Sequence, residues 1–218
     1  MKTLYIFLTR SGTLLSNLVY SLTGAQYTHI SLAFDEDLST LYSSTRKNGY
    51  TMFPAGPSRE YLNRGVFLMR ENIPCALYAL EVTDEAYTRA KRRTQHMMHH
   101  GELYRFNSLG LLLCWMHIRW QRRRHYFCSQ FVSEVLQKSG ALELPKPSTL
   151  MHPSDYAELP ELRCLYRGTL AGSPQRQSME RGRGWRASVG PLPERPSGGC
   201  EGQSASAVLI FSKNLLKN

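Results

Sequence analysis

The chain has 218 residues, a length typical of one folded domain with its own hydrophobic core, with or without a tail. Its 27 Lys and Arg exceed its 17 Asp and Glu, and the formal net charge of +10 favours anionic partners such as nucleic acid, lipid headgroups or wall polymers without selecting one. The five cysteines form no CxxC pair, which argues against a disulfide framework and against a thiolate zinc site.

Apolar runs in the sequence are short. The longest, near residues 109–118, is about half of the roughly 20 residues that a transmembrane helix needs. The run at residues 4–8 is too short for the core of a signal peptide. The sequence therefore predicts a soluble protein without a transmembrane segment, and the cysteine content predicts a cytoplasmic one.

Strands dominate the first half of the predicted chain. The expected elements are a strand at 3–9, a helix at 14–22 ended by Gly24, strands at 29–35 and 40–46, a long Gly- and Pro-containing loop at 47–64, and strands at 65–69 and 76–82.

Helices are expected mainly in the second half. Their predicted positions are a helix from an Asp84 N-cap to about residue 100, an apolar helix at 108–121 and an amphipathic helix at 128–138 closed by Gly140, before a helical turn after Pro153 and a last strand at 162–170.

The composition changes after residue 170. Residues 172–206 are rich in Gly, Ser, Pro, Arg and Gln and contain few large apolar side chains. Such a segment cannot bury enough surface to offset its ordering entropy. The sequence predicts one folded domain over 1–170 and a low-complexity, basic, disordered tail over 171–218.

Two segments carry a thiol and an imidazole in positions suited to nucleophilic catalysis. Cys128 begins the amphipathic helix, where the helix dipole and free N–H groups favour the thiolate and can stabilise an oxyanion. His29 begins a strand in which Ser31 and Ala33 share its face and leave room for another element beside the ring. If the helix packs on that strand, Cys128 would be the nucleophile and His29 its base. Each residue alone also has an ordinary structural explanation, as a small buried hydrophobe or a hydrogen-bonded histidine.

The motif YTHISLAFDED, followed about a hundred residues later by HYFCSQFVSEVL, resembles the circularly permuted branch of the NlpC/P60 papain-like superfamily, closest to the YiiX/YebB-like permuted amidases. The resemblance spans residues 3–170 and includes the helix SNLVYSLTG and the strand after a PSD turn. It implies an α+β fold, a small curved antiparallel sheet packed against helices, with the histidine preceding the cysteine. It also implies His29 as base and Cys128 as nucleophile.

The same resemblance implies a third polar residue, often a carboxylate, on the strand after the histidine strand. The matching position is Ser43, which carries no charge. A serine can fix the imidazole tautomer, but it stabilises an imidazolium less than a carboxylate does.

Basic residues near the expected site are candidates for substrate binding. Arg46 follows the strand of the third residue, and Arg124 ends the basic run 122–124 just before the nucleophile helix. Together with the apolar segment 109–120 as a flap, this run could recruit an anionic substrate or a lipid surface. A solvated loop is the simpler explanation.

Other histidines offer weaker alternatives. His125 is a rival base for Cys128, although sequence proximity directs the two side chains apart. His96, His99 and His100, with Glu102, could bind a metal, but an exposed polar helix end is the simpler explanation and we expect no metal.

The leading hypothesis is a cysteine peptidase or amidase type of hydrolase that cleaves an amide (peptide or isopeptide) or acyl-ester bond through a thioacyl intermediate, without a cofactor. Its substrate would be a peptide, a cell-wall fragment or an acyl lipid. The uncharged Ser43 leaves open a catalytically weak or inactive binding module of the same fold. The basic charge leaves open nucleic-acid binding, for which the sequence has no recognisable module.

Overall fold

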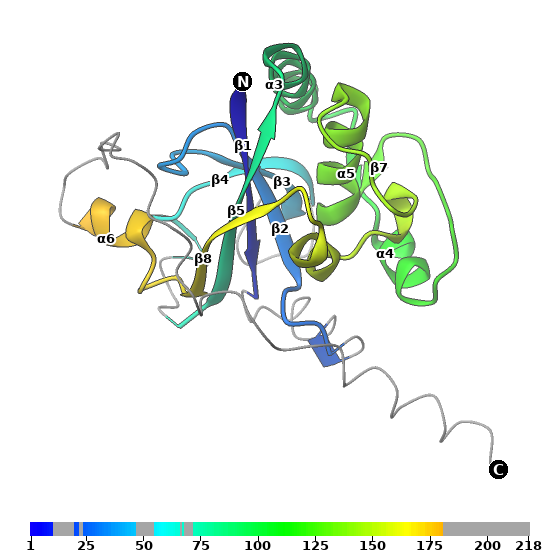
Figure 1. Ribbon diagram of the computed structural model, residues 1–218. Helices are drawn as coiled ribbons and strands as arrows, with labels where there is room; N and C mark the ends of the chain where they lie inside the picture. The colour runs from blue at the N-terminus through cyan, green and yellow to red at the C-terminus, as the bar shows by residue number, and fades with distance from the viewer. Residues whose placement is uncertain (11–19, 22–23, 47–54, 66, 68–71, 181–218) are drawn as a thin grey trace. The chain divides into compact units, whose positions relative to one another are not determined.

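A computed structural model describes residues 1–10, 20–21, 24–46, 55–65, 67 and 72–180. These residues form a mixed α+β structure around a six-stranded antiparallel sheet, with the strand order β4-β3-β2-β1-β5-β8 (Figure 1). The predicted α+β class is therefore confirmed. The strands are β1 (Lys2–Thr9), β2 (His29–Ala33), β3 (Leu41–Arg46), β4 (Ala55–Glu60), β5 (Pro74–Val82) and β8 (Arg163–Thr169).

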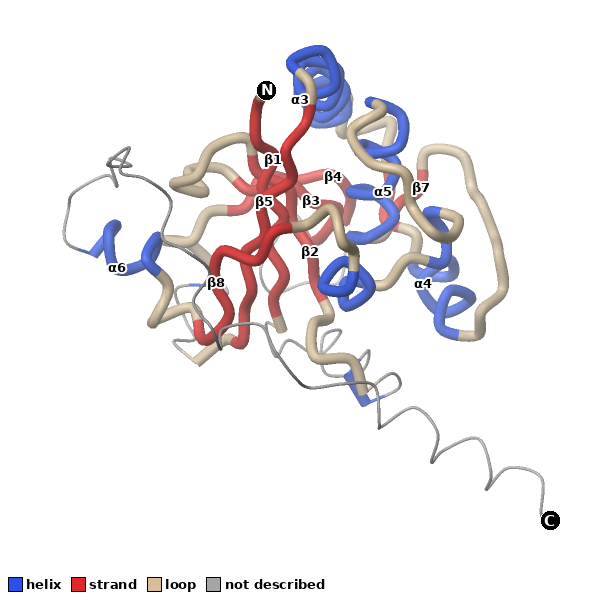
Figure 2. The backbone as a smooth tube through the Cα atoms, in the orientation of Figure 1, coloured by secondary structure: helices blue, strands red, loops and turns tan. Residues whose placement is uncertain are grey.

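Helices lie on both sides of the sheet, with α3 and α5 on one side and α6 on the other (Figure 2). A short parallel pair, β6 (Arg105–Phe106) with β7 (His125–Tyr126), flanks the segment that carries α4. The helical elements are α3 (Asp84–His99), α4 (Ser108–Trp115), α5 (Cys128–Ser139), α6 (Pro174–Glu180) and the 3-10 turns η1 (Ser148–Leu150) and η2 (Pro153–Glu158).

The alternation of β1 divides the core between the two faces of the sheet. Leu4, Ile6 and Leu8 are fully buried in the cluster that contains α3 and α5, whereas Phe7 belongs to the cluster on the opposite face. Helix α5 adds a fully buried stripe to the first cluster: Phe131, Val132, Val135 and Leu136. Burial of each such side chain contributes roughly 1.5–3 kcal/mol, so α5 is held firmly against the sheet.

Strand β4 lies within the segment for which the sequence predicted a long loop, and that prediction was wrong. Gly56 and Pro57 suggested a loop, but β4 is an edge strand, where proline is tolerated because one side of the strand needs no backbone donor. Gly56 allows close packing, since a Cβ atom there would stand only 3.0 Å from the Tyr104 carbonyl oxygen. Strands β3 and β4 pair in antiparallel fashion, with Leu41 opposite Glu60 at one end and Arg46 opposite Ala55 at the other.

Most other element boundaries agree with the expectations, with small differences. Thr83, not Asp84, is the N-cap of α3, because its Oγ1 accepts the Ala86 N–H at 3.2 Å. Helix α4 ends at Trp115, earlier than the expected residue 121. Gly140 ends α5 in the left-handed conformation (φ 70°), as predicted.

Some expectations fall on residues outside the described ranges. The helix at 14–22 and the strand at 65–69 lie largely outside them, although Gly24 has a φ of 64° and its N–H donates to the Tyr20 carbonyl at 2.7 Å. Helix α6 lies beyond the expected domain boundary at residue 170, and Arg176 on it donates to the Leu62 carbonyl at 2.6 Å. Residues 181–218 of the predicted tail are outside the described part. Within the described chain, no helix is long and apolar enough to cross a membrane.

Candidate active site

Helix α5 and strand β2 bring the predicted thiol and imidazole together. Cys128 is the first residue of α5 and is 8% exposed. His29 is the first residue of β2, and its side chain is 14% exposed. The Cys128 thiol lies close enough to the His29 imidazole to help raise its pKa. The two residues that the sequence singled out are therefore neighbours, at one end of a well-packed helix.

A carboxylate that the sequence did not predict also contacts the His29 imidazole. Glu60, the last residue of β4, places its Oε2 2.9 Å from the His29 Nε2. The Ser31 hydroxyl donates to the same Oε2 at 2.7 Å and lies 3.3 Å from Nε2. Glu60 is only 16% exposed, so this contact is shielded from solvent. A row of thiol, imidazole and carboxylate results.

The electrostatics of the row favour a charged imidazole beside a charged carboxylate. Burial lowers the pKa of His29, but the Glu60 carboxylate and the hydrogen bond to Cys128 raise it more, and the net pKa lies well above 6.5. Burial raises the pKa of Glu60, but His29 and the Ser31 hydrogen bond lower it more, and the net pKa falls below 4.5. Both shifts favour the charged forms, an imidazolium paired with a carboxylate.

The N-terminus of α5 also offers hydrogen-bond donors next to the sulfur. Its first backbone N–H groups have no acceptor within the helix, and the N-cap residue Phe127 makes no side-chain cap. The first intrahelical bond runs from the Phe131 N–H to the Phe127 carbonyl at 2.9 Å. Free N–H groups beside a nucleophile are suited to stabilise an oxyanion.

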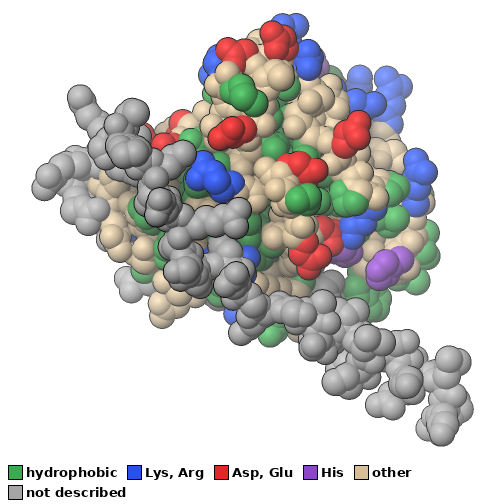
Figure 3. All heavy atoms as spheres, in the orientation of Figure 1, with side chains coloured by type: hydrophobic (Ala, Val, Ile, Leu, Met, Phe, Trp, Pro, Cys, Tyr) green, Lys and Arg blue, Asp and Glu red, His purple; other side chains and the backbone are tan. Residues whose placement is uncertain are grey.

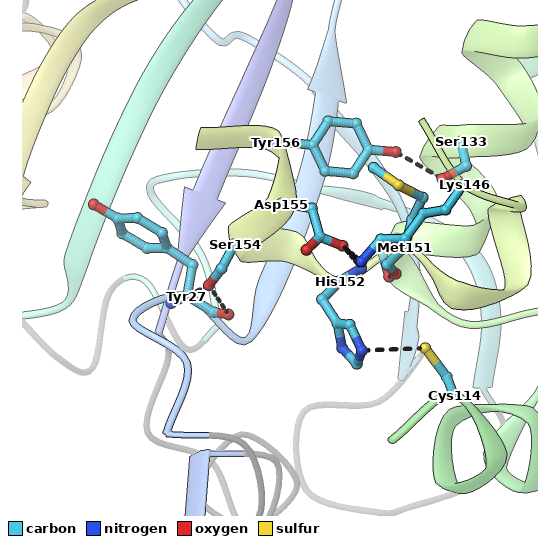
Figure 4. A network of polar contacts seen from close by, with 10 residues as sticks. Tyr27, Cys114, Ser133, Lys146, Met151, His152, Ser154, Asp155 and Tyr156 are labelled. Carbon is cyan, nitrogen blue, oxygen red and sulfur yellow. Dashed lines mark hydrogen bonds and ion pairs between the residues drawn. The ribbon is translucent and has the colours of Figure 1, made fainter. Parts of the chain in front are cut away.

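One segment, from Met151 to Tyr156, ties both halves of the site together (Figure 4). On the α5 side, the Ser129 hydroxyl donates to the Met151 carbonyl at 2.6 Å, and the Ser133 and Tyr156 hydroxyls are 2.7 Å apart. On the β2 side, the Ser154 hydroxyl lies 3.3 Å from both the N and the O of Tyr27, two residues before His29. This segment fixes the start of α5 relative to the approach to β2.

A second thiol–imidazole contact in Figure 4 has a different character. The Cys114 Sγ lies 3.7 Å from the His152 Nε2. Burial raises the pKa of the Cys114 thiol to about 12 and lowers the pKa of His152, so both groups are neutral. Asp155 accepts the His152 backbone N–H and pairs with Lys146 at 2.7 Å. This pair fastens α4 to the 151–156 segment and is not an activated nucleophile.

Ser43, the predicted third residue, does not make the expected contact. Its side chain is fully buried, and its hydroxyl donates to the Ile30 carbonyl at 3.0 Å. Glu60, not Ser43, contacts His29. The register explains the difference, because Ser43 pairs with Ser58 in β4, whereas Glu60 stands two residues further along that strand.

The predicted substrate-binding arginines have separate positions. The Arg46 backbone pairs with Ala55 at the end of β3, but its side chain lies outside the described structure. Arg124 is exposed just before β7, has a φ of 58°, and accepts the Arg105 N–H at its carbonyl at 2.9 Å. Neither residue is placed in contact with the Cys128–His29 pair by the described interactions.

The remaining histidines have their own partners. The Nδ1 of His125, the rival base, lies 2.8 Å from the Arg123 carbonyl. The His100 ring lies 4.6 Å from that of His96 and 4.9 Å from that of His99, and its Nδ1 is 3.8 Å from Glu102. Among the residues that the structure describes, no group of three or more His, Cys, Asp or Glu side chains is placed to hold a metal ion.

The sequence did not predict Glu60 as a site residue, because Gly56 and Pro57 are typical of loops and strand β4, which carries Glu60, was therefore not expected. One signal in the sequence pointed to it, since Glu60 is the single Asp or Glu between Asp37 and Glu71. Compared with known proteins, the chain matches no family model and no curated sequence.

Proposed function

We propose that the protein is a cysteine-dependent hydrolase of amide or acyl-ester bonds, with Cys128 as nucleophile, His29 as its base and Glu60 as the group that orients and charges the imidazole. The observation that carries this proposal is the continuous row from the Cys128 thiol through the His29 ring to the Glu60 carboxylate. An activated nucleophile requires this kind of arrangement, a base within hydrogen-bonding reach that is itself held by a third group.

The proposed reaction follows from the geometry of the ring. Because Nε2 faces Glu60, Nδ1 is the nitrogen left to exchange a proton with the sulfur. The thiolate attacks the carbonyl carbon to form a C–S bond, and N–H groups at the start of α5 stabilise the oxyanion. The C–N or C–O bond then breaks, and His29 gives its proton to the leaving group. Water, deprotonated by His29, hydrolyses the thioester and regenerates the thiol.

The carboxylate of Glu60 supports this function over a non-catalytic binding module. The hypothesis of an inactive module depended on the uncharged Ser43, but Glu60 now provides a carboxylate at the imidazole. The finer fold assignment, a permuted papain-like domain, is proposed with it. An antiparallel sheet, a late helix that begins at the cysteine and a histidine that precedes it in sequence all agree with the resemblance to permuted NlpC/P60 amidases.

An activated ester tests the proposal without knowledge of the natural substrate. Wild-type protein mixed with p-nitrophenyl acetate is expected to release a burst of p-nitrophenol and to carry one acetyl group on Cys128, located by peptide mass spectrometry after an acid quench. Cys128→Ala should abolish both signals. Absence of the burst in the wild type, or acetylation of Cys75 or Cys114 in place of Cys128, would overturn the proposal.

A further inference from the structure

Helix α4 and the loop that follows it expose an unusual amount of apolar surface. Its buried side is made of Gly110 and Cys114, whereas the other side faces outward. The exposed large apolar residues there are Leu109 (53%), Leu112 (47%), Trp115 (37%), Met116 (52%) and Ile118 (46%). Soluble monomers rarely expose a contiguous apolar patch of this kind unless it contacts a partner.

The same region is strongly basic. No Asp or Glu occurs between Glu102 and Glu134. The exposed arginines of the loop are Arg119, Arg122, Arg123 and Arg124, and none of them forms an ion pair with a carboxylate in the described structure. Figure 3 shows hydrophobic and basic side chains next to one another along the right-hand edge, where Figure 1 places α4 and β7. We call these nine side chains the α4 patch.

The α4 patch is fixed beside the first turn of α5. Gln130, the third residue of α5, accepts a hydrogen bond from the Asn107 amide at 3.1 Å and donates to the Gln121 side chain at 3.1 Å. Between Asn107 and Gln130 the chain contains two non-glycine residues with left-handed backbones, His117 (φ 60°) and Arg124 (φ 58°). Such backbones are strained and persist where surrounding contacts hold them.

We propose that the α4 patch docks on an anionic lipid surface. A bilayer interface supplies what both parts of the patch need, hydrocarbon for Leu109, Leu112 and Met116 and negatively charged headgroups for the arginines. A second copy of the chain fits less well, because a symmetric contact would bring the two sets of unpaired arginines together. A nucleic acid would neutralise the arginines but leave the aliphatic side chains without an apolar partner.

Vesicle co-sedimentation tests the docking independently of catalysis. Full-length protein should sediment with vesicles of phosphatidylcholine mixed with phosphatidylglycerol, and far less with phosphatidylcholine alone. Leu112→Ser/Met116→Ser and Arg122→Gln/Arg123→Gln should each lower the partition coefficient by about tenfold or more. The matched control Lys91→Gln/Arg92→Gln removes two exposed charges from α3 and should bind like the wild type. Cys128→Ala should also bind normally, so failure of docking and failure of the hydrolase proposal are distinguishable.

Three results would overturn the docking. The first is a wild type that does not sediment with the anionic vesicles, and the second is normal binding by both patch variants while their melting temperatures match that of the wild type. The third is a protein that does not bind vesicles and behaves in one of two other ways. Either it forms a dimer in light scattering that Leu112→Ser/Met116→Ser dissociates, or it binds RNA in a salt-sensitive manner. That result would assign the patch to self-association or to nucleic acid.

Discussion

The Glu60 Oε2 lies 2.9 Å from the His29 Nε2, although their strands are not neighbours in the sheet. Strand β3 runs between β2 and β4, and the Glu60 side chain reaches past it to the imidazole and to Ser31. The contact depends on the register of two successive strand pairs. It places a negative charge at the Nε2 of His29, which favours the protonated ring.

Removal of this charge should slow the proposed reaction. Glu60→Gln keeps the size of the side chain but loses the carboxylate that stabilises the imidazolium. We expect kcat/KM for activated-ester hydrolysis to fall about 10- to 100-fold. Glu134→Gln is a matched control, because Glu134 is also 16% exposed and pairs with Arg93 at 2.6 Å, away from the proposed reaction row. Equal rates for Glu60→Gln and the control would contradict the role of Glu60.

Alkylation should distinguish Cys128 from the other free thiols of the described chain, Cys75 and Cys114. Burial raises the pKa of both Cys75 and Cys114 to about 12, whereas Cys128 interacts with the His29 imidazole, whose own pKa is raised. We expect iodoacetamide to modify Cys128 first in the native protein, even below pH 7. Peptide mass spectrometry of timed samples measures the rates. His29→Ala should remove the labelling at low pH, and persistence of that labelling would exclude His29 as the partner.

The contribution of the His29–Glu60 pair to the free energy of unfolding should depend on pH, with a maximum in the weakly acidic range. The raised pKa of His29 gives a stabilisation that is fully present below about 6.5 and is lost as the pH rises through its folded-state pKa. The lowered pKa of Glu60 gives a stabilisation that is present above about 4.5 and is lost as the pH falls through its folded-state pKa. The difference in unfolding free energy between wild type and Glu60→Gln should therefore be largest between about pH 4.5 and 6.5.

Urea unfolding at a series of pH values measures this difference. Glu134→Gln, analysed in parallel, separates the effect of the His29 pair from the loss of a carboxylate in general. A difference between wild type and Glu60→Gln that stays constant across the whole pH series would show that His29 and Glu60 are not coupled in the folded state.

The hydrogen bond between Ser133 and Tyr156 should contribute to stability. Both hydroxyls are buried and lie 2.7 Å apart. Tyr156→Phe leaves the Ser133 hydroxyl without this partner, so we expect the unfolding free energy to fall by about 1–2 kcal/mol. Tyr166→Phe is the matched control, since its hydroxyl bonds to the Thr169 carbonyl at an exposed position and its loss should change stability by less than about 0.5 kcal/mol. Similar values for the two variants in thermal or urea unfolding would contradict the prediction.

Local patterns in the sequence determined much of the fold. The alternation of β1, the apolar stripe of α5 and the Gly140 end of that helix each depend on residues a few positions apart. For that reason the sequence could place Cys128 at a helix start and His29 at a strand start. Strand β4 gave no such pattern, because Gly56 and Pro57 are typical of loops and become compatible with a strand only at the edge of a sheet.

The sequence by itself therefore determined the two ends of the candidate site, a thiol on a helix and an imidazole on a strand. Only the tertiary structure decided which group completes it. Glu60 and His29 are 31 residues apart, and their contact depends on the register of β3 with β4, which sets Glu60 opposite Leu41. A shift of one residue would turn the carboxylate to the other face of the sheet. Long-range register of this kind has no local signature, and it brings Glu60 rather than Ser43 into contact with His29.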